Sequence, residues 1–175
     1  MRKLTLVLLV GLLGSVALAQ APTYFVKADM VRGAQGAMGP ACVPNSVFFN
    51  GEMIVFRAVV YDAATGEELT FDQIQERGIT ATVNMDGAEP LAMFFPPPQG
   101  SEPEGEAEGE AEGEGEGGPP PGADFFRGPF AIPADFPSGV YTWTIEVTDS
   151  AGNSAEFSPI GASAGLPSLI VQPAN

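Results

Sequence analysis

Gly139-Val-Tyr-Thr-Trp-Thr-Ile-Glu-Val-Thr-Asp-Ser-Ala-Gly-Asn153 is the stretch that decides the fold. After Val140, large apolar and polar side chains alternate strictly up to Thr148. Because successive side chains of a strand point to opposite faces, this pattern predicts a half-buried β-strand. The residues from Asp149 to Asn153 are small, polar or glycine, which is typical of a turn. The predicted inner face of the strand carries Tyr141, Trp143, Ile145 and Val147.

Shorter segments with the same alternation surround this strand. Thr70-Phe-Asp-Gln73 matches a capping box and Gly78 a helix end, so 70–77 is predicted to be a short helix. Glycines and prolines between residues 32 and 46 predict a loop. Short strands separated by turns indicate an all-β fold, an antiparallel β-sandwich with one short helix. The other predicted strands are 24–31, 47–49, 52–62, 79–85, 91–95, 125–126, 156–157 and 168–171.

The deciding stretch also resembles a known family. A Pro137-x-Gly139-x-Tyr141 lead enters the alternating strand, which ends in Asp149-x-x-Gly-Asn. Residues 132–153 therefore resemble the penultimate-strand region of bacterial extracytoplasmic immunoglobulin-like and fibronectin type III-like domains, and residues 51–65 are similar to their second-strand region. The resemblance implies an Ig-like β-sandwich that contacts other proteins, glycans or the cell surface. It implies no catalytic residues.

The N-terminus predicts export. Arg2 and Lys3 precede an apolar run from Leu4 to Leu18, and Ala17-Leu-Ala19 is a small-x-small cleavage site. This is the pattern of a signal peptide over residues 1–19. We therefore expect a periplasmic or secreted protein in which residues 20–175 form one domain. The apolar run is shorter than a membrane span needs, and no later segment is apolar enough, so no span is expected after cleavage.

Composition excludes several classes of function. The formal net charge is −15, and losing Arg2 and Lys3 makes the mature chain more acidic still. Such a chain repels phosphate backbones, so nucleic acid is not an expected partner. The sequence has no histidine and a single cysteine, which excludes Ser-His-Asp and Cys-His catalysis, His-ligated zinc and an internal disulfide. No enzymatic activity is predicted.

A glutamate-rich insertion interrupts the domain at residues 96–122. Prolines bound it, and its Glu-Gly and Glu-Ala repeats carry no apolar residue larger than alanine between Glu102 and Glu116. Because such a segment cannot bury enough surface to offset its ordering entropy, it is predicted to be disordered. Three interpretations stay open: a solvating spacer, weak diffuse binding of divalent cations, or docking to a basic partner. No other cofactor is predicted. The eight glutamates are Glu102, Glu104, Glu106, Glu108, Glu110, Glu112, Glu114 and Glu116.

Cys42 has three interpretations. It can be a small buried residue, because free cysteine is often buried. It can form an intermolecular disulfide and so link a dimer, since a leftover cysteine in an exported protein often pairs outside its own chain. It can also bind a soft metal such as Cu(I) together with Met30 and Met38, which are close in sequence.

Three phenylalanine pairs suggest a binding surface. In each pair, 48–49, 94–95 and 125–126, one ring points inward from its strand and the other outward. An outward ring is either covered by the N-terminal arm or the Gly/Ala-rich C-terminal connection, or forms an apolar patch of the kind that often marks an interface. Phe95 and Phe126 flank the insertion, so that end is the predicted partner surface. The expected function is an exported, non-catalytic Ig-like module that binds another exported or envelope protein. The alternative is a metal-handling protein that uses the Cys42 loop or the glutamates.

Overall fold

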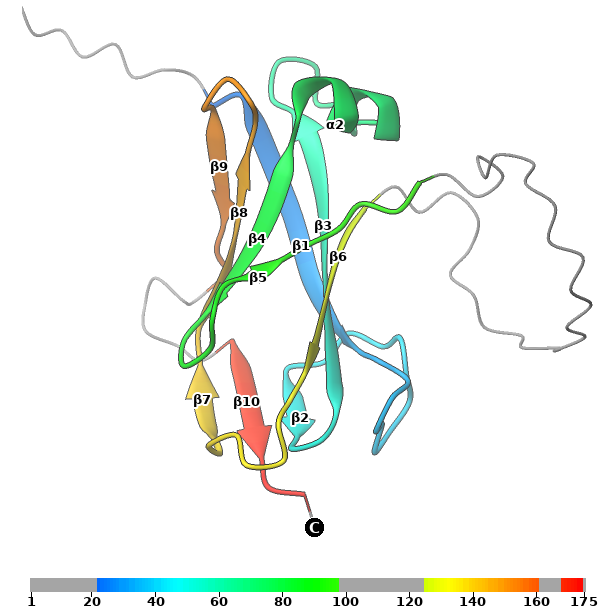
Figure 1. Ribbon diagram of the computed structural model, residues 1–175, viewed down its shortest axis with the longest axis vertical. Coiled ribbons are helices and arrows are strands. Elements are labelled where there is room, and N and C mark those ends of the chain that lie inside the picture. The colour runs from blue at the N-terminus through cyan, green and yellow to red at the C-terminus, as the bar shows by residue number, and fades with distance from the viewer. Residues whose placement is uncertain (1–21, 98–124, 161–167, 175) are drawn as a thin grey trace, which may run out of the picture.

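The computed structural model describes residues 22–97, 125–160 and 168–174. Within these ranges the chain is all-β except for one short helix (Figure 1). The predicted leader 1–19, the glutamates of the insertion and the connection 161–167 lie outside the described residues. The elements are β1 (Tyr24–Arg32), β2 (Val47–Phe49), β3 (Met53–Asp62), α2 (Phe71–Arg77), β4 (Thr80–Met85), β5 (Leu91–Ala92), β6 (Phe126–Ala131), β7 (Gly139–Tyr141), β8 (Trp143–Thr148), β9 (Ser154–Phe157) and β10 (Leu169–Gln172).

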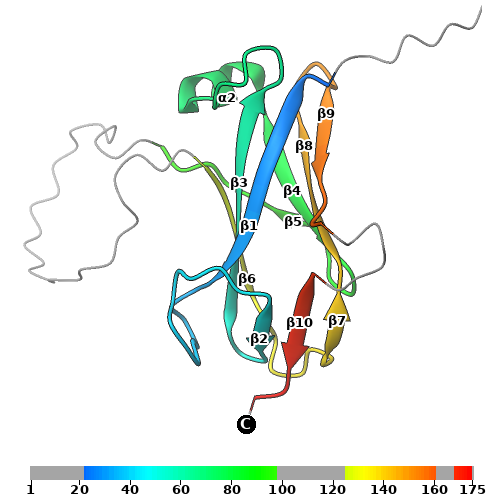
Figure 2. The same cartoon turned by 180° about the vertical axis from the view of Figure 1, so that it is seen from behind.

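The strands form three sheets, ordered β1-β3-β6, β5-β4-β8-β9 and β2-β10-β7. The first two face each other: β4 lies in front in Figure 1 and β1 lies in front in the reverse view of Figure 2. The small third sheet closes the end of the molecule opposite α2. Every pairing is antiparallel except β2 with β10, which is parallel. The two large sheets are therefore antiparallel, as the sequence predicts, whereas the small sheet also contains one parallel pair that the sequence did not predict.

Alternating side chains from both large sheets fill the core between them. Ile54, Phe56, Ala58 and Val60 of β3 are buried, whereas the residues between them are only half-buried. Trp143 of β8 packs on Phe56 with ring centroids 5.2 Å apart. The two sheets thus share one hydrophobic cluster, as the alternation in the sequence predicts.

The deciding stretch forms two strands rather than one. β7 pairs with β10, whereas β8 pairs with β4 and β9. Thr142 lies between them, and its backbone N–H and side-chain hydroxyl both donate to the Asp86 carboxylate. These bonds draw Thr142 towards the 86–87 turn, so the chain changes sheets there. The predicted inner face is confirmed for Trp143, Ile145 and Val147, which are buried, whereas Tyr141 is half-buried against the core.

The predicted partner strand 91–95 also changes sheets. Only Leu91 and Ala92 pair with β4. Two residues later Phe94 exchanges both backbone hydrogen bonds with Arg127 of β6, at N–O distances of 2.9 and 2.7 Å. The segment therefore connects the edge of one large sheet to the edge of the other.

Helix α2 begins and ends where the sequence predicts. The Thr70 side chain accepts from the Gln73 backbone N–H, and the Gln73 side chain accepts from the Thr70 N–H, completing the capping box. Gly78 ends the helix with a left-handed φ of 61°. Ile74 is buried against the core. In the part of the chain that the structure describes, no helix is long and apolar enough to cross a membrane.

Candidate functional site

Each phenylalanine pair has one inward and one outward ring, as strand geometry requires. Near the insertion, the rings that point outward are not the ones that the sequence suggested. Phe126 is only 2% exposed and belongs to the core. Phe95 is half-buried and meets Phe126 edge-on, with ring centroids 5.0 Å apart. The outward rings at this end are Phe94 and Phe125. Phe126 was predicted as an interaction residue because it flanks the insertion, but it is buried, since the inward register of β6 begins there.

The side of the β1-β3-β6 sheet turned away from the core carries an unusual set of side chains. We call it the outer face. Strand register places Phe25 beside Tyr61, Lys27 beside Val59, and Asp29 beside Arg57. Arg57 lies beside Arg127 of β6, which in turn lies beside Phe94. The outer face comprises Phe25, Lys27, Asp29, Arg57, Val59, Tyr61, Phe94, Phe125 and Arg127.

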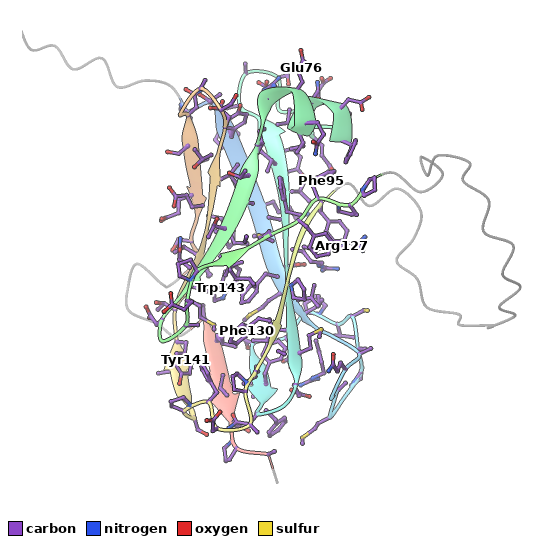
Figure 3. The ribbon with its side chains drawn as sticks, in the orientation of Figure 1. Glu76, Phe95, Arg127, Phe130, Tyr141 and Trp143 are labelled. Atoms are coloured by element: carbon purple, nitrogen blue, oxygen red, sulfur yellow. The ribbon has the colours of Figure 1, made fainter. Side chains whose placement is uncertain are left out.

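Aromatic rings stand exposed at two places on this face. Phe25 is 54% exposed and Phe94 is 51% exposed. Phe125 is half-buried because two guanidinium groups cover it: the Cζ atoms of Arg127 and Arg57 lie 4.9 and 5.8 Å from its ring centroid. Such cation–π contacts favour a fixed position for the ring and both arginines. Figure 3 shows Arg127 below Phe95, on the side of the molecule from which the chain leaves towards the insertion.

The positive charges of the outer face differ in whether they are paired. Arg57 donates from Nε to Asp29 Oδ1 at 2.7 Å and from a second nitrogen to Oδ2. Hydrogen bonding to Asp29 raises the pKa of Arg57 above its ordinary value. Among the described residues Lys27 and Arg127 have no carboxylate within ion-pair distance, and the buried Nε of Arg127 has no hydrogen-bond partner. The face therefore presents two unpaired cations beside exposed aromatic rings.

The basic residues are concentrated on this face. Outside the predicted leader the sequence contains five of them. Arg32 and Arg77 lie elsewhere and are paired with Glu52 and Asp62. The other three, Lys27, Arg57 and Arg127, lie on the outer face. Sequence reasoning missed this surface. The signal that points to it is Arg57, a charged residue at an outward position of the 52–62 strand.

A buried ion pair holds the loop that carries Cys42. The Glu52 side chain is fully buried and its Oε1 lies 2.9 Å from Arg32 Nε. The N–H direction misses the oxygen, so this is a contact between charges rather than a hydrogen bond. Glu52 accepts from the backbone N–H groups of Met38 and Phe49, at 2.6 and 2.9 Å. One carboxylate thus ties the 33–46 loop to the end of β2.

Cys42 is exposed, so its interpretation as a buried core residue was wrong. Its φ is 58°, and its N–H donates to the Arg32 carbonyl at 2.7 Å. The backbone bond fixes the residue in the loop while the thiol stays accessible. A disulfide-linked dimer stays a prediction, and non-reducing electrophoresis tests it.

The three sulfur atoms of the predicted soft-metal site lie in different environments. Met30 is 6% exposed and belongs to the core, whereas Met38 is 52% exposed and Cys42 is also exposed. Among the described residues no group of three or more His, Cys, Asp or Glu side chains is placed to hold a metal ion. Metal handling stays a prediction. A Cu(I) adduct in native mass spectrometry that Cys42→Ser removes would support it, and the absence of any adduct would contradict it.

A scan against models of protein families found no match, and neither did searches of curated proteins and of solved structures. The geometry of the chain itself therefore defines its class: an all-β protein with an aromatic and cationic outer face.

Proposed function

We propose that this chain is an exported, non-catalytic Ig-like β-sandwich module that binds another exported or envelope protein through its outer face. The observation that carries the proposal is that one face of the protein holds the exposed rings of Phe25 and Phe94 together with the two arginines that cover Phe125. Aromatic residues and arginine are enriched in protein interfaces and dominate their binding energy. In a monomer these rings would stay in contact with water, whereas a partner would cover them.

Two features support the Ig-like assignment. Two antiparallel sheets face each other over a core that contains Trp143 and Phe56. The Tyr141 hydroxyl donates to the backbone carbonyl of Pro137, four residues upstream. A tyrosine bonded in this way at the corner of a sandwich is a feature of Ig-like domains. Helix α2 and the division of the Gly139–Thr148 stretch are departures from the plainest form of that fold.

Affinity capture from the envelope fraction of the exporting cell tests the proposed function. The bait is the mature chain, compared with a Phe25→Ser, Phe94→Ser double variant. Val140→Ser is the matched control, because Val140 is 64% exposed but lies on β7, in the small sheet. We expect one protein to bind the wild-type chain and the control saturably, and to bind the double variant at least about tenfold more weakly, which corresponds to about 1.4 kcal/mol.

Circular dichroism of all three proteins shows whether each variant has kept its fold. Equal binding by the folded double variant would contradict the outer face as the interface. Export is tested separately by expressing the full chain in the exporting cell, where the intact mass of the recovered protein should place Gln20 first. A chain that retains Met1 would contradict cleavage after Ala19.

A further inference from the structure

The described residues that flank the insertion lie close to the outer face. Residues 98–124 lie outside the described residues, but Pro97 and Phe125 are described. Phe125 belongs to the outer face, and Phe94, three residues before Pro97, is paired to β6 at Arg127. Phe94 before the segment of eight glutamates and Phe125 after it therefore both contact Arg127, which has no ion-pair partner among the described residues.

We propose that the glutamates between Glu102 and Glu116 dock on the outer face of their own chain, with Arg127 and Lys27 as the cations that they meet. The charges are complementary, because the outer face holds three of the five basic residues outside the predicted leader. The inference goes beyond the proposed function, since it needs no partner protein.

The lengths involved allow this contact. Lys27 and Arg127 lie on strands separated only by β3, and their partners Val59 and Arg57 are two residues apart on β3. Two inter-strand spacings across and two residues along place their backbones about 12 Å apart. Glu116 is nine residues before Phe125, and an extended chain covers about 3.3 Å per residue. Its reach of about 30 Å exceeds the width of the face. Because both ends are tethered, the effective concentration of carboxylates at the face is on the order of millimolar.

The contact is weak and sensitive to salt. An exposed ion pair contributes about 0–1 kcal/mol, and salt screens it. Since a glutamate stands at every second position from 102 to 116, many alternative pairings with the two cations have similar energy. The cations are then neutralised in many registers rather than by one fixed bond. This multiplicity favours the docked population without ordering the segment in one conformation.

Nuclear magnetic resonance of the mature chain tests the inference. The comparison is with a variant in which all eight glutamates become glutamine, which keeps the length and removes the charge. At low salt we expect the largest differences in backbone amide shift at Lys27, Val59, Phe94 and Arg127. We expect β7 and β10, which belong to the small sheet at the end of the molecule opposite α2, to be unchanged. In about 1 M salt, where the screening length is about 3 Å, the backbone amide shifts of the outer-face residues should become the same in the two proteins.

A second variant tests the same contact from the outer face, without any change in the glutamate segment. Lys27→Gln changes an exposed side chain, so it leaves the fold intact and should reduce the shift differences across the face. Arg77→Gln is the control, because Arg77 pairs with Asp62 away from the face. Equal spectra of the wild-type and glutamine chains at low salt would overturn the inference, as would differences spread evenly over the whole molecule. Differences that disappear on dilution would overturn it in favour of docking between copies. None of these results depends on whether a partner protein binds.

Discussion

Asp149 shows how a single residue can close one end of the fold. Its Oδ1 accepts from the backbone N–H groups of Ala151 and Asn153, at 2.9 and 2.8 Å. Its Oδ2 accepts from the Asn153 side chain and from the Tyr24 hydroxyl, both at 2.8 Å. The side chain is only 9% exposed. One carboxylate therefore holds the β8–β9 turn and ties it to the start of β1.

The same bonds make stability depend on pH. Hydrogen bonds from the Asn153 side chain, and next from Tyr24, lower the pKa of Asp149 from 3.8 to about 2. A group whose pKa is lower in the folded state stabilises the fold above its unfolded pKa, and this contribution is lost as the pH falls through the folded pKa. We expect the melting temperature of the wild-type chain to exceed that of Asp149→Asn at pH 5, and the difference to shrink between about pH 4 and pH 2.

Thermal melts of both proteins across that pH range measure the effect. The pKa of Asp62 is also lowered, mainly by the Ala64 backbone N–H, but it titrates in both proteins and cancels in their difference. A difference in melting temperature that stays constant from pH 5 to pH 2 would contradict the assigned role of the Asp149 charge.

Single residues were predicted well where local chemistry determines them and poorly where distant strands do. Thr70 and Gly78 were identified as helix caps, because a cap depends on its neighbours in sequence. The exposure of Cys42 and the inward position of Phe126 depend on strand register and on the buried Arg32–Glu52 pair. Neither the register nor the pair can be read from residue spacing, because each depends on residues brought together by folding.

Among the elements, the strands that change sheets were the least predictable. The alternation over Gly139–Thr148 correctly gave the inner face, yet it does not show that Thr142 separates β7 from β8. The break comes from Asp86, more than fifty residues away in sequence. The same holds for β5, whose neighbour Phe94 pairs with β6 instead of β4. Periodicity identifies which side chains point inward, but it does not identify the partner strand.

Gly128 is the residue that lets the chain cross between the large sheets. A Cβ atom there would lie 3.1 Å from Met93 Cγ, 3.4 Å from Leu91 Cδ2 and 3.4 Å from Val83 Cγ2. We expect Gly128→Val to lower the free energy of unfolding by about 1–3 kcal/mol, because added methyl groups overpack the core at this crossing. Urea unfolding measures the change.

Ala131→Val is the matched control for this crossing. It adds methyl groups at an exposed position of the same strand, so its effect should stay within about 0.5 kcal/mol. If the two substitutions cost the same, the close approach at Gly128 does not limit packing.

At the scale of the whole molecule, the sequence predicted the fold class but not the surface that we propose for binding. An all-β fold with one short helix follows from local patterns, which the structure confirms within the described residues. The outer face needs strands β1, β3 and β6 in register, so that Lys27, Arg57 and Arg127 lie on one side. That arrangement is a property of the assembled sheet, and no single segment contains it.

Within the described residues, one hydrophobic cluster joins the parts of the chain on both sides of the insertion. We expect deletion of residues 100–118 to change the melting temperature by only a few degrees, because loop-closure entropy varies slowly with length and any docked ion pairs are weak. Differential scanning calorimetry measures this. A drop of more than about 10 °C, which corresponds to roughly 2.5–5 kcal/mol, would show that the segment is structural.

The direction of the strands at the two ends of the described chain has a mechanical consequence. β1 begins at the end of the molecule that carries α2, and β10 runs towards the opposite end (Figures 1 and 2). A pulling force between Tyr24 and Gln172 would therefore act along both strands. Ladder hydrogen bonds lie across the strands, so they would be sheared together rather than opened one by one. In single-molecule pulling, the chain should resist this load better than one applied across the sheets, and equal resistance in the two directions would contradict the shear geometry.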